Sequence, residues 1–137
     1  MTTIQEGKAH ILVVDDQDDI RTIIQRVLKK NDFTCFMARD GDEALDIIRN
    51  TPIDVVITDI EMPGINGIEL TSRIKREYNA DVIIMTGFTK DFKYEEIIEK
   101  GASDFMQKPI GAKEILMRLN RVLKERALLK ERNRAEE

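Results

Sequence analysis

The chain has 137 residues, the size of one domain that can bury a hydrophobic core without disulfides or a structural metal. Hydrophobic residues make up 42% and charged residues 35% of the chain, an ordinary balance for a globular domain. The formal net charge of −4 argues against direct nucleic-acid binding, because no basic excess is available to neutralise phosphates.

The predicted elements alternate between strands and helices. Strands are predicted where short apolar runs occur, and helices where apolar residues recur at spacings of three and four. In chain order, the expected elements are a strand at residues 11–14, a helix at 20–28, a strand at 33–38, a helix at 44–48, a strand at 54–59, a helix at 68–74, a strand at 81–86, a helix at 92–100, a strand at 103–107 and a helix from 112 onward.

This alternation predicts an α/β fold with a five-stranded parallel sheet covered by helices on both faces. Right-handed crossovers make the sheet doubly wound, and the expected strand order is 2-1-3-4-5, which is flavodoxin-like. In such sheets ligands bind beyond the carboxyl ends of the strands, near the switch in strand order. The candidate site is therefore expected at that edge.

We expect a cytoplasmic protein without membrane contact. No apolar run approaches the roughly 20 residues that span a bilayer, and residues 1–8 lack the hydrophobic stretch of a secretory signal. The one cysteine, Cys35, cannot form an internal disulfide, and its place in an apolar run indicates a core position.

Three segments are expected from the change in composition along the chain. Residues 1–8 are predicted to be a disordered tail and residues 9–123 the folded domain. Residues 124–137 continue the last helix as a charged, helix-favouring extension. Two interpretations of this extension stay open: a solvated helix end, or a linker or short coiled coil that leads to a partner or an output domain.

Polar residues collect where the predicted strands end. Asp15 and Asp16 follow the first strand, Asp59 ends the third, Thr86 ends the fourth and Lys108 follows the fifth. A parallel sheet brings these side chains to one pocket. Three carboxylates without a cation repel one another and raise at least one pKa, and a hard cation with oxygen ligands, such as Mg²⁺, resolves that conflict.

Four segments at these strand ends resemble the receiver domains of two-component response regulators, which act in bacterial signalling. They are VVDD at residues 13–16, DIEMPGING at 59–67, MTG at 85–87 and KP at 108–109. The resemblance implies a phosphorelay switch in which Asp59 looks like the phosphoacceptor. Its carboxylate would displace the histidine of a histidine kinase or phosphotransfer protein. Such a domain assists its own phosphorylation and dephosphorylation and is not a multiple-turnover enzyme on external substrates.

The resemblance also implies a set of metal ligands. Asp16, Asp59 and the backbone carbonyl of Glu61 would hold Mg²⁺ directly, and Asp15 would act through metal-bound water. Glu61 and Phe88, each two residues beyond a site residue, are expected to border the phosphoryl group and to set its lifetime. Phe88 would shield the acyl phosphate from water, and Glu61 would add local negative charge.

Five further positions resemble the phosphoryl-binding and switching residues of the family. Lys108 would pair with one phosphoryl oxygen, and Thr86 would hydrogen-bond another. Pro109 resembles the cis proline that turns Lys108 into the pocket, and Gly87 leaves the pocket open to a donor. Phe105 stands where the family keeps a rotating aromatic, here without a hydroxyl.

The resemblance places the output surface on the fourth helix, fifth strand and fifth helix, where Tyr94 and Ile98 are candidate partner contacts. Core packing is an equal alternative for Ile98. Whether the chain forms a homodimer, and whether it is the N-terminal receiver of a multidomain regulator with a transcriptional or second-messenger output, stays open.

Three other functions compete with the phosphoacceptor switch. A flavin-binding protein of this topology needs a phosphate-binding loop rich in glycine and hydroxyl residues after the first strand. Residues 15–19 are instead mostly acidic and would repel a phosphate. An Asp-nucleophile phosphatase has a second carboxylate two residues after the nucleophile, and Glu61 occupies that position. A receiver-like scaffold that is never phosphorylated is disfavoured because no signature residue is missing.

Overall fold

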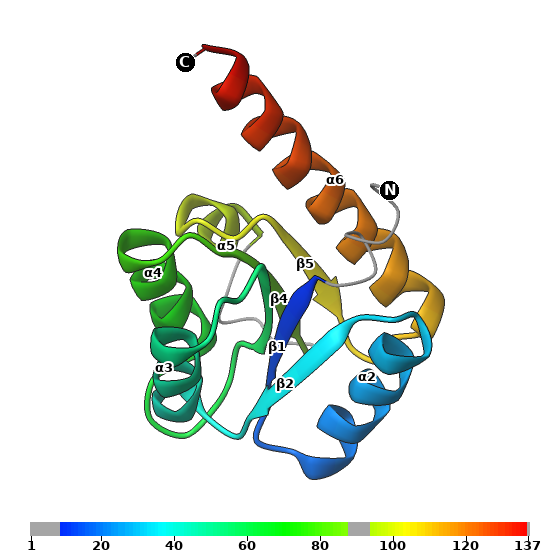
Figure 1. Cartoon of the computed structure of the whole chain (residues 1–137). Coiled ribbons are helices and arrows are strands. Elements are labelled where there is room, and N and C mark those ends of the chain that lie inside the picture. The colour runs from blue at the N-terminus through cyan, green and yellow to red at the C-terminus, as the bar shows by residue number, and fades with distance from the viewer. Residues whose placement is uncertain (1–8, 88–93, 137) are drawn as a thin grey trace.

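Five parallel strands form one sheet, in the order β2-β1-β3-β4-β5, in the computed structural model, which describes residues 9–87 and 94–136. The strands are β1 (His10–Val14), β2 (Thr34–Ala38), β3 (Val55–Asp59), β4 (Asp81–Thr86) and β5 (Asp104–Gln107). The helices are α2 (Asp18–Lys30), α3 (Gly41–Asn50), α4 (Gly67–Glu77), α5 (Tyr94–Glu99) and α6 (Ala112–Glu136). The predicted doubly wound, flavodoxin-like α/β fold and its strand order are confirmed (Figure 1).

The boundaries differ from the predicted ones by a few residues, because capping and turn chemistry decide where helices begin. The side chain of Asp40 accepts a hydrogen bond from the backbone N–H of Glu43, so α3 begins at Gly41. Asn66 caps α4 in the same way. The expected start of the fourth helix, at residue 92, lies outside the described residues.

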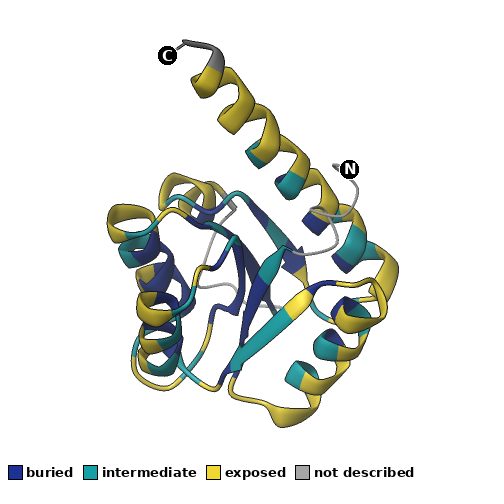
Figure 2. Ribbon diagram, viewed as in Figure 1, coloured by how far each residue is buried: buried dark blue, intermediate teal, exposed yellow. Residues whose placement is uncertain are grey.

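Alternate residues of each strand supply two separate cores. On β1, Leu12 and Val14 face the core beneath α3, α4 and α5, whereas Ile11 and Val13 face the core beneath α2 and α6. All four side chains are completely buried, and burying one such side chain stabilises the fold by roughly 1.5–3 kcal/mol. Figure 2 shows the central strands buried between two partly exposed helical layers, whereas the edge strand β2 is partly exposed.

Cys35 lies in β2 and is half-buried against the core beneath α2 and α6. Burial raises the pKa of its thiol to about 11, an effect that the nearby charge of Lys29 only partly opposes. The thiol is therefore protonated at neutral pH, in agreement with the predicted packing role. None of the described helices is long and apolar enough to cross a membrane.

Helix α6 continues well beyond the sheet as one straight element (Figure 1). Its first half buries Ile115, Leu119 and Val122, whereas Leu128 and Leu129 are more than half exposed. Figure 2 shows the same change from buried to exposed along the helix. Whether this exposed half leads to a partner or an output domain stays a prediction.

One side chain ties the middle of α6 to the amino-terminal ends of β3 and β4. Arg126 is only 11% exposed, and its guanidinium donates to Asp81 Oδ2 at 3.2 Å and to the backbone carbonyl of Asn79 at 2.7 Å. Its Nε lies 3.7 Å from Asp54 Oδ1. Charge-assisted hydrogen bonds at a shielded site are stronger than exposed ion pairs, so this contact sets the direction in which α6 leaves the domain.

We expect Arg126→Ala to lower the free energy of unfolding by about 1–3 kcal/mol, because Asp81 and the carbonyl of Asn79 each lose a charged hydrogen-bond donor and Asp54 loses an ion-pair partner. Urea denaturation followed by circular dichroism measures the change. Arg121→Ala is the matched control, since Arg121 is exposed and, among the described residues, pairs only with Glu125 on its own helix. The control should change stability by less than about 0.5 kcal/mol, and equal losses in both variants would contradict the anchoring role.

Candidate functional site

The register of the sheet brings polar residues from four strand ends to one edge. Asp15 comes directly after the last residue of β1, and Asp59 comes directly after the residue of β3 that is aligned with it. The two aspartates therefore lie level with each other. Thr86 ends β4, and Lys108 follows the residue of β5 aligned with Thr86. The backbone N–H of Lys108 also donates to the carbonyl of Thr86 at 2.8 Å. The sheet thus brings together the residues that the sequence placed at this edge.

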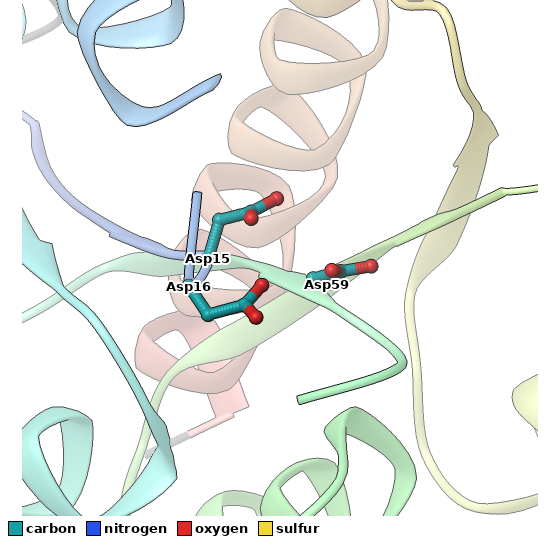
Figure 3. A group of neighbouring side chains, drawn as sticks. All are labelled: Asp15, Asp16 and Asp59. Atoms are coloured by element: carbon teal, nitrogen blue, oxygen red, sulfur yellow. The ribbon is translucent and has the colours of Figure 1, made fainter. Parts of the chain in front are cut away.

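Asp15, Asp16 and Asp59 form a cluster of carboxylates (Figure 3). Each offers one oxygen, and these three oxygens lie within 4.8 Å of one another. Asp15 is completely buried and Asp59 is 7% exposed, whereas Asp16 is exposed. Two carboxylates therefore lie in a low-dielectric setting, and the third faces solvent.

Lys108 bridges the two buried carboxylates. Its Nζ lies 3.0 Å from Asp15 Oδ2 and 3.3 Å from Asp59 Oδ2. The remaining oxygens accept backbone hydrogen bonds, Asp15 Oδ1 from Gln17 at 2.9 Å and Asp59 Oδ1 from Ile60 at 2.8 Å. Every oxygen of the two buried carboxylates thereby has a partner within the protein.

Burial and like charge act together on Asp59. Burial raises the pKa of its carboxyl, the negative charge of Asp15 raises it further, and Lys108 only partly offsets both effects. For Lys108, burial acts to lower the pKa, but the hydrogen bond to Asp15 and the charges of both carboxylates raise it above its ordinary value. Lys108 is therefore fully charged, and it offsets only part of the repulsion between the carboxylates of Asp59 and Asp15.

The remaining predicted site residues lie around this centre. Thr86 is 9% exposed, and its hydroxyl donates to the carbonyl of Gly87 at 2.9 Å. Phe105 is half-buried and packs against the core beneath α3, α4 and α5, and the Lys108–Pro109 peptide bond is cis. Glu61 is exposed. Phe88 lies outside the described residues, so its expected shielding role stays a prediction.

The expected partner contacts on α5 are resolved only in part. Ile97 is 2% exposed and supplies the core contact, whereas its neighbour Ile98 is 37% exposed. Ile98 is therefore available on the surface rather than needed in the core. The side chain of Tyr94 lies outside the part of the chain that the structure describes.

Gly67 holds the loop after Asp59 in a way that sequence reasoning missed. Its backbone N–H donates to the carbonyl of Ile60 at 2.8 Å, and a Cβ at this position would lie 2.2 Å from the carbonyl oxygen of Asp59. Only a residue without a side chain permits this approach. The available signal was a glycine directly after the helix cap Asn66, but the sequence alone does not say which backbone it approaches.

The model of the response regulator receiver domain family matches residues 11–120 of the chain. The chain belongs to this family. The match covers the sheet, helices α2 to α5 and the first part of α6, and it includes every carboxylate of the cluster. Membership speaks against the flavin-binding alternative.

Individual relatives agree with this placement. Over 115 residues the receiver domain is 30% identical to Protein PetR of Rhodobacter capsulatus, covering 84% of the chain but 48% of that protein. The chain thus spans about half the length of this curated relative. A response regulator receiver domain protein from Clostridium thermocellum is 31% identical over 88% of the chain and 98% of its own, with a TM-score of 0.82. Chemotaxis response regulator CheY4 of Vibrio cholerae is 29% identical over 84% of the chain and 98% of its own, with a TM-score of 0.78.

Gly67→Ala is expected to destabilise the receiver domain by about 3 kcal/mol, at the upper end of the cost of overpacking, because the added methyl group collides with backbone. Urea denaturation measures the change. Gly111→Ala is the control, since a Cβ there meets nothing within 4 Å. The control should cost at most about 1 kcal/mol at this helix start, and a Gly67 variant as stable as the control would contradict the close approach.

Asp59→Asn is expected to raise the free energy of unfolding at neutral pH in metal-free buffer. The folded state raises the pKa of Asp59, so it binds this proton more tightly than the unfolded chain does. Stability of the natural protein therefore falls as pH rises from the unfolded pKa through the raised folded pKa, and the loss is complete above both.

Urea denaturation of both proteins at a series of pH values, with a chelator present, measures this effect. The advantage of the Asn variant should be full at neutral pH and should shrink as the pH falls through that window. An advantage that does not change with pH would show that charge at Asp59 is not its source.

Proposed function

We propose that the receiver domain accepts a phosphoryl group on Asp59 from a histidine kinase or phosphotransfer protein, in a reaction that requires Mg²⁺. The observation that carries this proposal is the position of Asp59, a buried carboxylate between two other carboxylates and the ammonium group of Lys108. Burial and the neighbouring charge of Asp15 both act against the ionised form of Asp59. A cation bound here relieves that repulsion.

The donor set fits Mg²⁺. Three carboxylate oxygens lie within 4.8 Å of one another, and an oxygen-only donor set is the kind that this hard cation prefers. Asp16 and Asp59 would hold the ion directly with the backbone carbonyl of Glu61, and Asp15 would act through water. When bound, the ion neutralises charge on the incoming phosphoryl group and orients it.

The residues of the chain supply the rest of the transfer. An oxygen of Asp59 attacks phosphorus in line, the bond from phosphorus to the histidine nitrogen of the partner breaks, and that nitrogen keeps the electron pair. Lys108 leaves its bridge between the carboxylates and pairs with a phosphoryl oxygen. The hydroxyl of Thr86 leaves the carbonyl of Gly87 and donates to another phosphoryl oxygen.

The signal would then pass to the surface formed by α5, β5 and α6. The phosphoryl group adds roughly −1.5 to −2 charge and three acceptor oxygens, which draw Thr86 towards Asp59. Phe105 would follow by packing, since it has no hydroxyl to form a hydrogen bond. Ile98 on α5 offers an exposed apolar contact to a partner. Glu61 and Phe88 would set the lifetime of the acyl phosphate.

The downstream response would be produced by a cytoplasmic partner protein or by an output domain linked through α6. Similar receiver domains occur in longer chains: this chain covers 28% of NtrX from Brucella abortus, at 30% identity, and 52% of a probable two-component system response regulator/GGDEF domain protein, at 25% identity. These relatives favour a multidomain regulator, and the exposed half of α6 would be its linker. Direct nucleic-acid binding by the receiver domain and membrane contact are not part of the proposal.

The proposal predicts that the protein takes up label from phosphorus-labelled acetyl phosphate with Mg²⁺ and that Asp59→Asn takes up none. Asp46→Asn is the control, because Asp46 is an exposed carboxylate on α3 that forms an ion pair with Arg49. Its labelling should equal that of the natural protein. Labelling of the Asp59 variant, or none of the natural protein, would contradict the proposal. Steady release of phosphate from a generic phosphoester over many turnovers would favour the phosphatase alternative.

A further inference from the structure

The turn between β1 and α2 carries Asp15 and Asp16, and a buried arginine holds it. Arg21 reaches back from α2, and its Nη1 donates to the backbone carbonyl of Asp15 at 2.6 Å. The other guanidinium nitrogen, Nη2, pairs with Asp18. The side chain of Arg21 is 11% exposed, whereas that of Asp18 is 88% exposed. Arg21 is thus folded against the turn rather than extended into solvent.

This turn lacks the support that fixes the corresponding turns before α3 and α4. Those helices begin with the side-chain caps of Asp40 and Asn66. At the start of α2, Gln17 occupies the cap position, but its side chain makes no capping hydrogen bond. In its place, the backbone N–H of Gln17 donates to Asp15 Oδ1, and Arg21 holds the carbonyl of the same residue.

We propose that Arg21 is a positioning residue for the cation site. By holding the carbonyl of Asp15, it fixes the backbone from which the exposed carboxylate of Asp16 projects towards Asp59 (Figure 3). This inference rests on the proposed function, because it assigns Arg21 to the Mg²⁺ that Asp16 and Asp59 would bind. The planar guanidinium suits the role, since it donates to the carbonyl and to Asp18 at once, which a single ammonium group does less well.

Two effects of Arg21 on a bound cation oppose each other. Its positive charge repels the ion, so removing that charge acts to tighten binding. The pairing with Asp18 offsets this charge, and solvent around the exposed Asp18 screens what remains. Loss of a residue that orients a metal ligand weakens affinity by about 10–100-fold in proteins. Positioning therefore outweighs repulsion, and the net effect of removing Arg21 is weaker binding.

The test is a Mg²⁺ titration of the metal-free, folded protein, followed by amide chemical shifts in NMR spectra. Arg21→Met keeps most of the side-chain volume and should raise the dissociation constant for Mg²⁺ about tenfold. Arg21→Lys keeps the charge and one donor and should fall between the natural protein and the Met variant, about threefold weaker. Arg26→Met is the control, because Arg26 is exposed on the same helix, and it should leave the affinity unchanged.

Each outcome decides between the inference and the proposed function. If the natural protein binds no Mg²⁺ in the millimolar range, the proposed function fails and the inference fails with it. If the natural protein binds Mg²⁺ and either Arg21 variant binds it at least as tightly, only the positioning role is overturned. If Arg21→Met does not fold, the comparison of Arg21→Lys with the natural protein still tests the positioning role. A purely structural role would lower the unfolding midpoint of the metal-free variants without changing the Mg²⁺ affinity of the folded state, and that result also overturns the inference.

Discussion

The bridge from Lys108 to two buried carboxylates is the interaction on which the site depends. Asp15 and Asp59 are held at the same level of the sheet by strand register, so their negative charges cannot move apart. Burial, followed by the charge of Asp15, raises the pKa of Asp59 above its usual value, and Lys108 offsets these effects only in part. A site with this remaining repulsion favours whatever brings positive charge. In the proposed function a cation meets this preference, and Lys108 would then be available to a phosphoryl group.

The two ends of the sheet have different roles: the carboxyl ends of the strands hold the site, and the amino ends anchor α6. At the carboxyl ends, backbone N–H groups and Lys108 hold the carboxylates, and Gly67 lets the following loop pass close to the backbone of Asp59. At the amino ends, Arg126 ties α6 to the starts of β3 and β4. Helix α6 also packs against the sheet between these ends, through Ile115 and Leu119. A change at the carboxyl ends therefore acts on a helix whose middle is fixed to the opposite end of the sheet by Arg126.

Much of the site was predictable because its residues stand in sequence directly after strands. The apolar run before Asp15 and the one that ends at Asp59 identify two strand ends, and the parallel arrangement brings them to one edge. The position of the carboxylate cluster followed from the same reasoning. The burial of Asp15, the exposure of Asp16 and the hydrogen bond of Thr86 to its neighbour did not follow, because they depend on side-chain directions that no local pattern encodes.

The sequence by itself determined the alternation of strands and helices, the class of fold and the set of polar residues at one edge. Those properties arise from local periodicity and from the types of residue that end each strand. Only the tertiary structure decided that Lys108 bridges Asp15, 93 residues away, and that Arg21 and Arg126 turn inward rather than into solvent. The physical reason is that strand register and helix packing set these distances. A long charged side chain can reach solvent or a partner equally well until the rest of the fold is in place.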